Sequence, residues 1–222
     1  MENASCYPQG FRHICQEAVQ CNKCFEGGGL KRPLVDKAQP RWIGSGYAAT
    51  SPRIVFMLLN PGSGGGRQDG ADESLRNLLH RYETGEDMLD QIMQHQRSDI
   101  PKWGNGRLMK FLRLSNIDID GVALMNIAWC ASEQNEYPRS MLRSCFERHT
   151  LRALVALEPN VVILSGTKTH AFKKEIRRAL PHSTTLQTLH YAHRKGHEAT
   201  LSATEKLRLT IATIRDPEQS GP

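Results

Sequence analysis

Hydrophobic residues gather in four short blocks along this chain, separated by longer stretches whose apolar positions have helical spacing. The first block, RIVFMLLN at 53–60, is nearly continuous and lies between Ser51-Pro52 and Pro61-Gly62. A short apolar run between turn residues predicts a strand buried on both faces. Similar blocks predict three further strands: GVALMNIAWC from Gly121, whose end carries Asn126 and Cys130, NVVILSG from Asn160, and STTLQTLH ending at His190.

The stretches between these blocks predict amphipathic helices. We expect them near residues 11–20, once or twice within 72–97, at 107–114, from Pro138 to about residue 157, after Gly166-Thr167, and from Ser202 with Ser202 or Thr204 as cap. Strands that alternate with helices imply right-handed crossovers and a parallel sheet. The pattern therefore predicts a three-layer αβα fold of the α/β class with a central four-stranded parallel sheet. Residues 1–50 are expected to form a loop-rich lead-in with one short helix.

Length and composition favour a single domain over residues 1–222. Of the 222 residues, 39% are hydrophobic and 23% charged, which suits one sizeable core. No apolar run approaches the roughly 20 residues of a membrane span, and the N-terminus lacks the apolar stretch of a signal peptide. We therefore expect a cytoplasmic monomer with no membrane association. The net charge of +6 suits an anionic partner such as DNA, and equally an ordinary basic surface.

The cysteine pattern predicts a metal or iron-sulfur site. Four cysteines lie near the N-terminus and two in the middle of the chain: Cys6, Cys15, Cys21, Cys24, Cys130 and Cys145. In a reducing compartment a disulfide framework is uncommon, so thiolate ligation is the leading interpretation. Two alternatives stay open, namely a local zinc knot made by the four N-terminal cysteines and a role of Cys130 and Cys145 as small buried hydrophobes.

Ligands of parallel α/β sheets collect at the carboxyl ends of the strands. The predicted strand ends carry polar or glycine-containing segments: Asn60-Pro61-Gly62, residues 126–130, Ser165-Gly166-Thr167 and residues 190–193. We therefore expect the functional site to be built from these four segments.

The strand-end residues resemble the motifs of the uracil-DNA glycosylase superfamily, over most of the chain from Cys21 to about Gly196. Leu59-Asn60-Pro61-Gly62 is similar to the Asn-Pro-Gly form of its first motif, Asn126 to its base-reading Asn, and His190 to the His that opens its last motif. The order and spacing of the three make the resemblance specific.

The cysteines resemble the iron-sulfur, thermophile-type branch of that superfamily, in which four of them hold a 4Fe-4S cluster. The matching residues are Cys21, Cys24, Cys130 and Cys145. The resemblance implies this cluster as a structural cofactor, with zinc as the alternative. The chain departs from that branch where the branch has Glu-Ala-Pro-Gly instead of Leu59-Asn60-Pro61-Gly62, and where its His-Pro is replaced by His190-Tyr191. These departures leave the substrate open.

The resemblance implies a DNA glycosylase that flips a pyrimidine out of DNA and hydrolyses its N-glycosidic bond. Asn60 would orient the water, His190 would donate to the base carbonyl oxygen, where charge accumulates, and Asn126 would pair with the base edge. Simpler interpretations are that Asn60 only begins a turn before proline and that His190 is a satisfied histidine at a strand end, with His193 as its competitor.

DNA contacts are expected at two loops. Gly166 and Thr167 at a strand-to-helix turn could offer backbone amides and a hydroxyl to a phosphate. Arg194 and Lys195 would add positive charge to the loop that this superfamily inserts at the lesion. For these two, an ordinary solvated basic loop is the alternative.

Gly62 stands where the uracil-specific branch has an aromatic residue that blocks substituents at carbon 5 of the base, and three more glycines follow at 64–66. An open pocket admits 5-substituted pyrimidines, although the glycines could serve a tight turn alone. We therefore expect a bulky 5-modified cytosine as substrate, such as the glucosylated hydroxymethylcytosine of phage DNA, and a role in antiphage defence. The alternatives are uracil removal in base-excision repair, a non-catalytic nucleic-acid-binding protein, and covalent capture of the abasic product by a histidine within 190–197.

Overall fold

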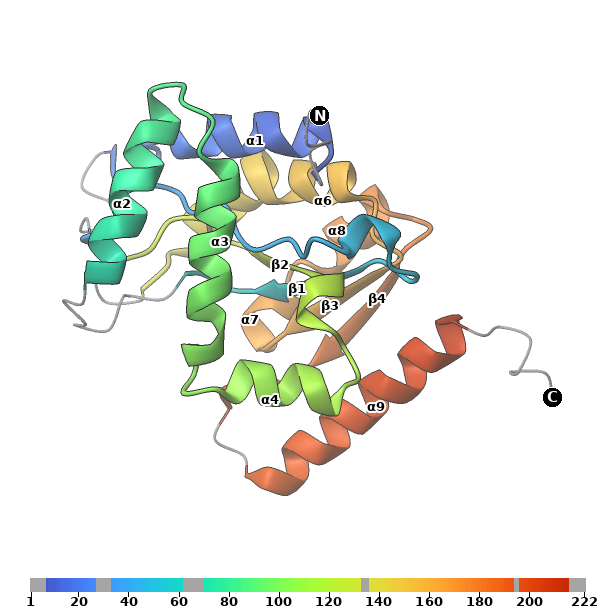
Figure 1. The fold of residues 1–222 in the computed structure, drawn as a ribbon. Coiled ribbons are helices and arrows are strands. Elements are labelled where there is room, and N and C mark those ends of the chain that lie inside the picture. Colours follow the sequence, from blue (N-terminus) through green and yellow to red (C-terminus); the bar gives the residue numbers. More distant parts are fainter. Residues whose placement is uncertain (1–6, 27–32, 62–69, 133–135, 194–195, 216–222) are drawn as a thin grey trace.

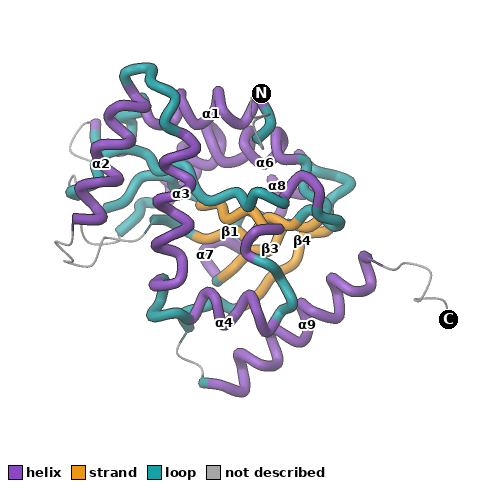
Figure 2. Tube along the Cα trace, in the orientation of Figure 1, coloured by secondary structure: helices purple, strands orange, loops and turns teal. Residues whose placement is uncertain are grey.

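The computed structural model, which describes residues 7–26, 33–61, 70–132, 136–193 and 196–215, has an α/β fold around a four-stranded parallel sheet. The strands are β1 (Ile54–Leu58), β2 (Val122–Asn126), β3 (Val161–Ser165) and β4 (Thr184–Thr188), and their spatial order is β2-β1-β3-β4. Helices flank the sheet, whose strands are orange in Figure 2. The predicted α/β class, the parallel sheet and its four strands are confirmed.

The hydrophobic blocks form strands because the sheet is covered on both faces. Every residue of β1, β2 and β3 is buried, whereas edge strand β4 is buried only at Thr188. In the register, Leu58 pairs with Asn126 and Ser165 pairs with Thr188. Because all strands are parallel, their carboxyl ends lie at the same edge of the sheet.

The helices lie on both sides of the sheet (Figure 1). On one side lie α1 (Gln9–Val19), α6 (Leu151–Leu157) and α8 (Lys173–Ala179), on the other α4 (Arg107–Leu114) and α9 (His197–Arg215), and at one flank α2 (Gly70–Glu83) and α3 (Leu89–Asp99). The shorter elements are α5 (Arg139–Cys145), the π-helical turn η6 (Phe146–Thr150), α7 (Thr167–His170), and 3-10 turns at Tyr47–Ala49, Ile100–Lys102 and Ile119–Gly121.

Several predicted boundaries were wrong. Helix α9 begins at His197, so Ser202 and Thr204 lie inside it, and the Thr204 hydroxyl donates to the Thr200 carbonyl (3.0 Å) instead of capping the helix. The helix expected from Pro138 is divided by the π-helical turn η6, and the one after Gly166 is divided into α7 and α8. Strand β2 ends at Asn126, and Cys130 lies in the loop beyond it. Apolar periodicity does not reveal such local changes in backbone hydrogen bonding.

The N-terminal lead-in contributes more to the core than its composition predicts. Phe11 and Cys15 of α1 are completely buried. The segment at 39–44, part of the blue coil that crosses the front of Figure 1, runs antiparallel beside β2. Ile43 bridges Ala123, and the Leu124 amide donates to the Trp42 carbonyl at 2.7 Å. This segment covers the outer edge of β2, which would otherwise expose unpaired backbone groups.

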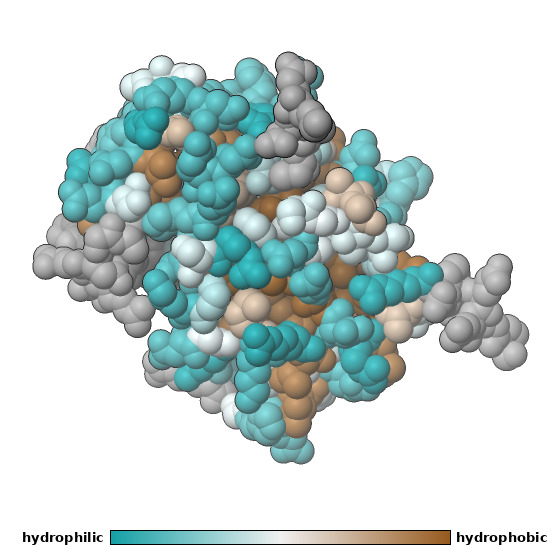
Figure 3. Space-filling model, viewed as in Figure 1, coloured by the Kyte–Doolittle hydropathy of each residue, from teal (hydrophilic) through white to brown (hydrophobic). Residues whose placement is uncertain are grey.

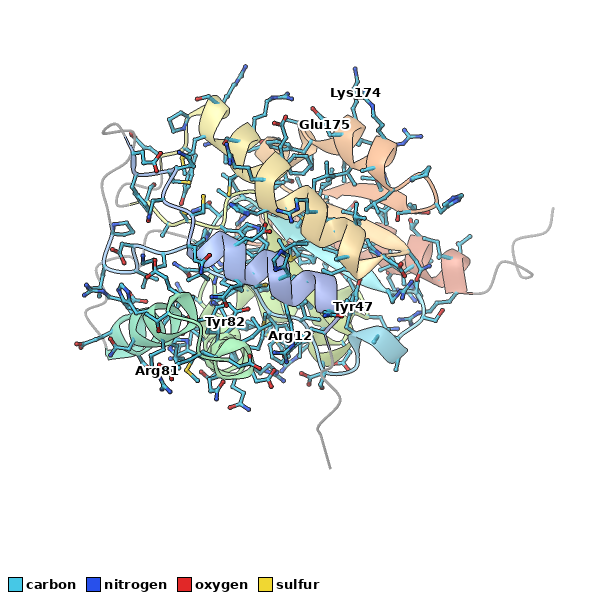
Figure 4. All side chains as sticks on the ribbon, turned by 90° about the horizontal axis from the view of Figure 1, so that it is seen from above. Arg12, Tyr47, Arg81, Tyr82, Lys174 and Glu175 are labelled. Atoms are coloured by element: carbon cyan, nitrogen blue, oxygen red, sulfur yellow. The ribbon has the colours of Figure 1, made fainter. Side chains whose placement is uncertain are left out.

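Helix α1 is also tied to the flanking helices. Figure 4 shows Arg12 of α1 near Tyr82 of α2. The Tyr82 hydroxyl donates to the Arg12 carbonyl (3.1 Å), and Arg12 Nη1 lies 2.9 Å from Asp87 Oδ1. The face shown in Figure 3 is mostly hydrophilic, with apolar areas between the polar side chains. Within the described ranges, no helix combines the length and apolarity needed to cross a bilayer.

Candidate functional site

The carboxyl ends of β1 and β2 bring two of the predicted site residues onto neighbouring strands. Asn126 is the last residue of β2 and is paired with Leu58, two residues before Asn60. Beyond the strands, the Ile127 amide donates to the Leu58 carbonyl (2.9 Å) and the Ala128 amide to the Leu59 carbonyl (2.8 Å). The segments that follow β1 and β2 are therefore held together at this edge, which we call the rim.

The Asn126 side chain is buried without a hydrogen-bond partner among the described residues. Only 1% of the residue is exposed, and neither Oδ1 nor Nδ2 makes a hydrogen bond. The Thr188 hydroxyl, at the end of β4, is likewise buried and unbonded. A buried polar group without a partner costs about 1–3 kcal/mol. An amide with both a donor and an acceptor left over is suited to a ligand that offers the complementary pair, such as the edge of a nucleobase.

Asn60 is held in one orientation by an aromatic residue that the sequence did not single out. Its Nδ2 donates to the Tyr137 hydroxyl (3.0 Å), which in turn donates to the Cys130 carbonyl (3.1 Å). This bond fixes which end of the Asn60 amide faces the phenol. Burial raises the pKa of Tyr137, so the phenol stays protonated and remains a donor. This chain of bonds joins the first motif to the loop that carries a predicted cysteine ligand.

His190 lies two residues beyond β4, against the turn that follows β3. Gly166 has φ +94°, a backbone conformation that favours glycine, and a Cβ added there would lie 3.2 Å from the His190 Cβ. The Ala192 amide donates to His190 Nδ1 at 3.1 Å. An imidazole whose Nδ1 accepts must, when neutral, carry its proton on Nε2. Burial, followed by the charge of His193, lowers the pKa of His190 and so favours this neutral donor.

The remaining predicted DNA and base contacts are described only in part. Thr167 is exposed at the start of α7, directly after Gly166, in the strand-to-helix turn where it was expected. Gly62, Arg194 and Lys195 lie outside the described residues, as do the glycines at 64–66. The rim thus has Asn60 and Asn126 on adjacent strands and His190 at the far side of β3.

A basic hollow opens beside the His190 loop. It has a volume of about 400 Å³ and is lined by four basic side chains, Arg107 and Lys110 of α4, His193, and His197 of α9. Tyr191 and Phe111 form part of its wall, and none of its described lining residues is acidic. Such a hollow suits an anion such as a backbone phosphate. Sequence reasoning missed it because α4 and α9 are distant in the chain and meet only in the fold.

All four predicted cysteine ligands line a second cavity, of about 300 Å³. Cys24, Cys130 and Cys145 are buried, and Cys21 is half-buried. Cys130 and Cys145 both lie close enough to Cys24 to change its pKa, and the Trp129 amide donates to Cys145 Sγ (3.3 Å). The structure thus gathers residues that are more than 100 positions apart in the sequence. We call this the cysteine cavity.

The thiols of the cysteine cavity compete for one negative charge. Hydrogen bonds from Cys130 and Cys145 lower the pKa of Cys24 to about 4, against the opposing effect of burial. The bond to Cys24 and burial raise the pKa values of Cys130 and Cys145. A single thiolate is therefore favoured, and ionising the other thiols requires a positive group among them.

The number and type of donors around the cavity match the ligands of an iron-sulfur cluster. Within the described ranges, no group of three or more His, Cys, Asp or Glu side chains is arranged to hold one metal ion. A 4Fe-4S cluster needs one thiolate at each of four corners, and four thiols surround the cavity. Cys15 does not line it and is buried on α1, while Cys6 lies outside the described residues. The zinc knot made by the four N-terminal cysteines stays an untested alternative.

The π-helical turn η6 connects the cysteine cavity with the rim. His149 of this turn lines the cavity, is 6% exposed and has no hydrogen-bond partner at either ring nitrogen. The hydroxyl of the next residue, Thr150, contacts the carbonyls of Asn126 (2.9 Å) and Ile127 (3.0 Å), and accepts from Trp129 Nε1 (3.0 Å). π-helical turns are frequent at functional sites. Neither residue was predicted, because no apolar pattern marks the turn.

Comparisons with known proteins add no assignment to this geometry. No protein-family model matches the chain, and no curated protein matches it either.

Proposed function

We propose that the protein is a monofunctional DNA glycosylase, which extrudes a pyrimidine nucleotide and hydrolyses its N-glycosidic bond. The observation that carries the proposal is the Asn126 amide, buried at the rim with both its donor and its acceptor unpaired. A pyrimidine edge carries an acceptor next to a donor, so it can satisfy both atoms at once. A site for a base that has left the duplex would have this form.

The other rim residues suit the chemistry of bond cleavage. Asn60, oriented by Tyr137, presents Oδ1 as an acceptor for a water proton. His190, neutral with its proton on Nε2, is a donor for the base carbonyl oxygen on which negative charge develops. When the bond to the sugar breaks, its electron pair stays on the base, and the water oxygen bonds to the sugar carbon. Asn60 orients the water and does not need to act as a strong base.

Contacts to DNA would come from the loops around the rim. The basic hollow has four basic residues on its wall, and its Tyr191 neighbours His190, so a phosphate bound there would flank an extruded nucleotide. Thr167 and the amides of the turn after Gly166 would hold a second phosphate. The chain's net charge of +6 favours this partner.

The cysteine cavity would hold the 4Fe-4S cluster through Cys21, Cys24, Cys130 and Cys145. When bound, the cluster supplies a structural clamp between the N-terminal lead-in and the loop after β2. Tyr137 connects that loop to Asn60 through its hydrogen bonds, and Thr150 bonds to the Asn126 carbonyl. The position of the loop therefore affects the positions of Asn60 and Asn126. Tyr137 and Thr150 are therefore positioning residues, not catalytic ones.

For the substrate we propose a 5-modified cytosine, with antiphage defence as the role, on the basis of the glycines at 62 and 64–66. The alternative is uracil in DNA repair. The Asn126 amide pairs with either base, depending on which way it is turned. Base identity is therefore a question for a panel of substrates.

The test is base release from defined oligonucleotides that contain uracil, cytosine, hydroxymethylcytosine or glucosylated hydroxymethylcytosine, scored as alkali-labile abasic sites. We expect release from at least one, reduced about 10²- to 10³-fold by Asn60→Ala or His190→Ala with DNA affinity retained. His182→Ala, an exposed histidine on the loop before β4, is the matched control and should not change the rate. Tight DNA binding without release from any substrate would favour a binding protein, and release from uracil alone would reject the defence role.

A further inference from the structure

A buried arginine in the segment beside β2 forms no ion pair with any carboxylate of the described residues. Arg41 belongs to the segment that runs beside β2 and is 6% exposed. Its Nη1 donates to the buried Gln96 Oε1 (2.7 Å), while its Nε and the Gln96 Nε2 are buried without hydrogen bonds. No ion pair joins Arg41 to a carboxylate in the described part of the chain. Burying a charge without a counter-charge is costly, so a residue kept in this state calls for a reason.

A series of packing contacts, through side chains and the backbone of Gly104, leads from Arg41 to His190. The Arg41 guanidinium lies 4.9 Å from the centre of the Trp103 ring. The residue after Trp103 is Gly104, and the Tyr191 ring packs so closely on it that an added Cβ would lie 2.8 Å from Tyr191 Cε2. Tyr191 stacks on His190 with ring centres 4.5 Å apart. Arg41 is thus connected by packing to the proposed donor at the rim.

The titratable groups that act on Arg41 include one that also contacts Asn60. Tyr191, Tyr137 and Asp99 are the groups whose negative charge would favour the protonated guanidinium, and Tyr137 is the residue that orients Asn60. Burial lowers the pKa of Arg41 to about 10, so the residue keeps its charge at neutral pH. A buried positive charge that is not directly paired acts over several ångströms, because little in a dry interior screens it.

We propose that Arg41 supplies a fixed positive charge that stabilises the negative charge of the departing pyrimidine, an inference that rests on the proposed glycosylase function. As the bond between the sugar C1′ and the base N1 breaks, the electron pair stays on N1 and spreads to the ring carbonyl oxygens. The water oxygen bonds to C1′, and its proton passes to solvent. The Arg41 charge does not change in this step, and it lowers the energy of the state in which the base is anionic.

A packing role for Arg41 makes a different prediction from an electrostatic one. A buried ion that serves only packing can be replaced by an apolar side chain of similar length, often with no loss of stability. Arg41→Met retains contact with the Trp103 ring and removes the charge, whereas Arg41→Lys retains the charge. Arg97 provides a matched control, since it also lies over a tryptophan, Trp42 (5.9 Å), but is paired with Asp120 (3.0 Å).

The experiment measures single-turnover base release at saturating DNA for a pyrimidine and its 5-fluoro analogue in the same oligonucleotide, uracil with 5-fluorouracil or cytosine with 5-fluorocytosine. Fluorine stabilises the leaving anion, so the fluoro base needs less help from the protein. We expect Arg41→Met to slow release of the unsubstituted base by about 10²-fold and of the fluoro base by clearly less, with an unchanged or higher melting temperature. Arg41→Lys should keep most of the rate, and Arg97→Met should leave both rates unchanged.

If Arg41→Met slows the release of both bases equally, or slows neither, the electrostatic role is overturned. If Arg41→Met does not fold, the comparison is made with Arg41→Gln, which also removes the charge but keeps a donor for Gln96 Oε1, and which should again slow release of the unsubstituted base more. A wild-type protein that releases neither base would reject the proposed function itself. That result is distinct, because it is seen before any variant is compared.

Discussion

The cysteine cavity and the rim both contain buried polar groups that call for a ligand, but the cavity favours a charged one and the rim a neutral one. In the cavity, the pKa of Cys24 is lowered while burial and the neighbouring thiol raise the pKa values of Cys130 and Cys145, which favours one negative charge over several. At the rim, the Asn126 amide is neutral and has both a donor and an acceptor to spare. The first arrangement favours a positively charged inorganic group, and the second a neutral planar edge. Although they differ in chemistry, the two regions are joined by Tyr137 and by Thr150, so damage to one is expected to reach the other.

The largest effect is expected from breaking the centre of the cysteine cavity. Cys24→Ser should lose the bound iron and much of the soluble yield, because serine is a poor ligand and Cys24 holds the charge shared by Cys130 and Cys145. The measurement is iron and sulfide analysis with visible absorbance. Cys15→Ala, a buried cysteine outside the cavity, is the control and should keep its iron at a cost of about 1 kcal/mol in unfolding free energy. A well-folded, iron-loaded Cys24→Ser protein would contradict the assignment.

The second prediction separates function from stability at the rim. Asn126→Leu replaces an unpaired buried amide by an apolar group of similar shape. We expect base release to fall by about 10²- to 10³-fold, while the free energy of unfolding rises by about 1 kcal/mol. Single-turnover assays and urea denaturation measure the two quantities. A clear loss of stability together with activity would show instead that the amide serves the fold.

The third prediction concerns the basic hollow beside the rim. Replacing Arg107 and Lys110 by Ala should weaken DNA binding and reduce the slope of log affinity against log salt by up to about 1.8, since each lost phosphate contact accounts for about 0.9. Release at saturating DNA should change little. The control is the pair Lys174→Ala and Arg177→Ala on α8, which are exposed on the other side of the sheet (Figures 1 and 4). An equal change in slope for both pairs would argue against a specific phosphate site.

The smallest effect is a change in the titration of His190. Burial and the neighbouring His193 charge lower its pKa, so the unfolded chain binds this proton more readily than the folded one. Stability is therefore lost as the pH falls from about 6.5, the ordinary value for histidine, through the lowered pKa. His193→Gln should raise the pKa of His190 and so narrow the pH range over which stability is lost. Titration followed by NMR of the ring protons tests this, with His182→Gln as the control that should leave His190 unchanged.

The sequence was most informative where a pattern has a local cause. Each apolar block between turn residues became a strand, and the helix expected at 107–114 was found with those bounds. The predicted four cysteines share a cavity, and Asn60 and Asn126 lie on adjacent strand ends. It was least informative about the helix start at His197 and the π-helical turn, where competing backbone hydrogen bonds decide the boundary.

The amino-acid sequence alone determined the α/β sheet, because strands buried on both faces require continuous apolar runs. It also determined which polar groups follow the carboxyl ends of the strands. Only the tertiary structure decided that Tyr137 orients Asn60, and that within the described residues the Asn126 amide makes no hydrogen bond and Arg41 forms no ion pair. The physical reason is that burial and hydrogen bonding depend on which segments approach one another in space. Those approaches bring together residues that no local pattern connects.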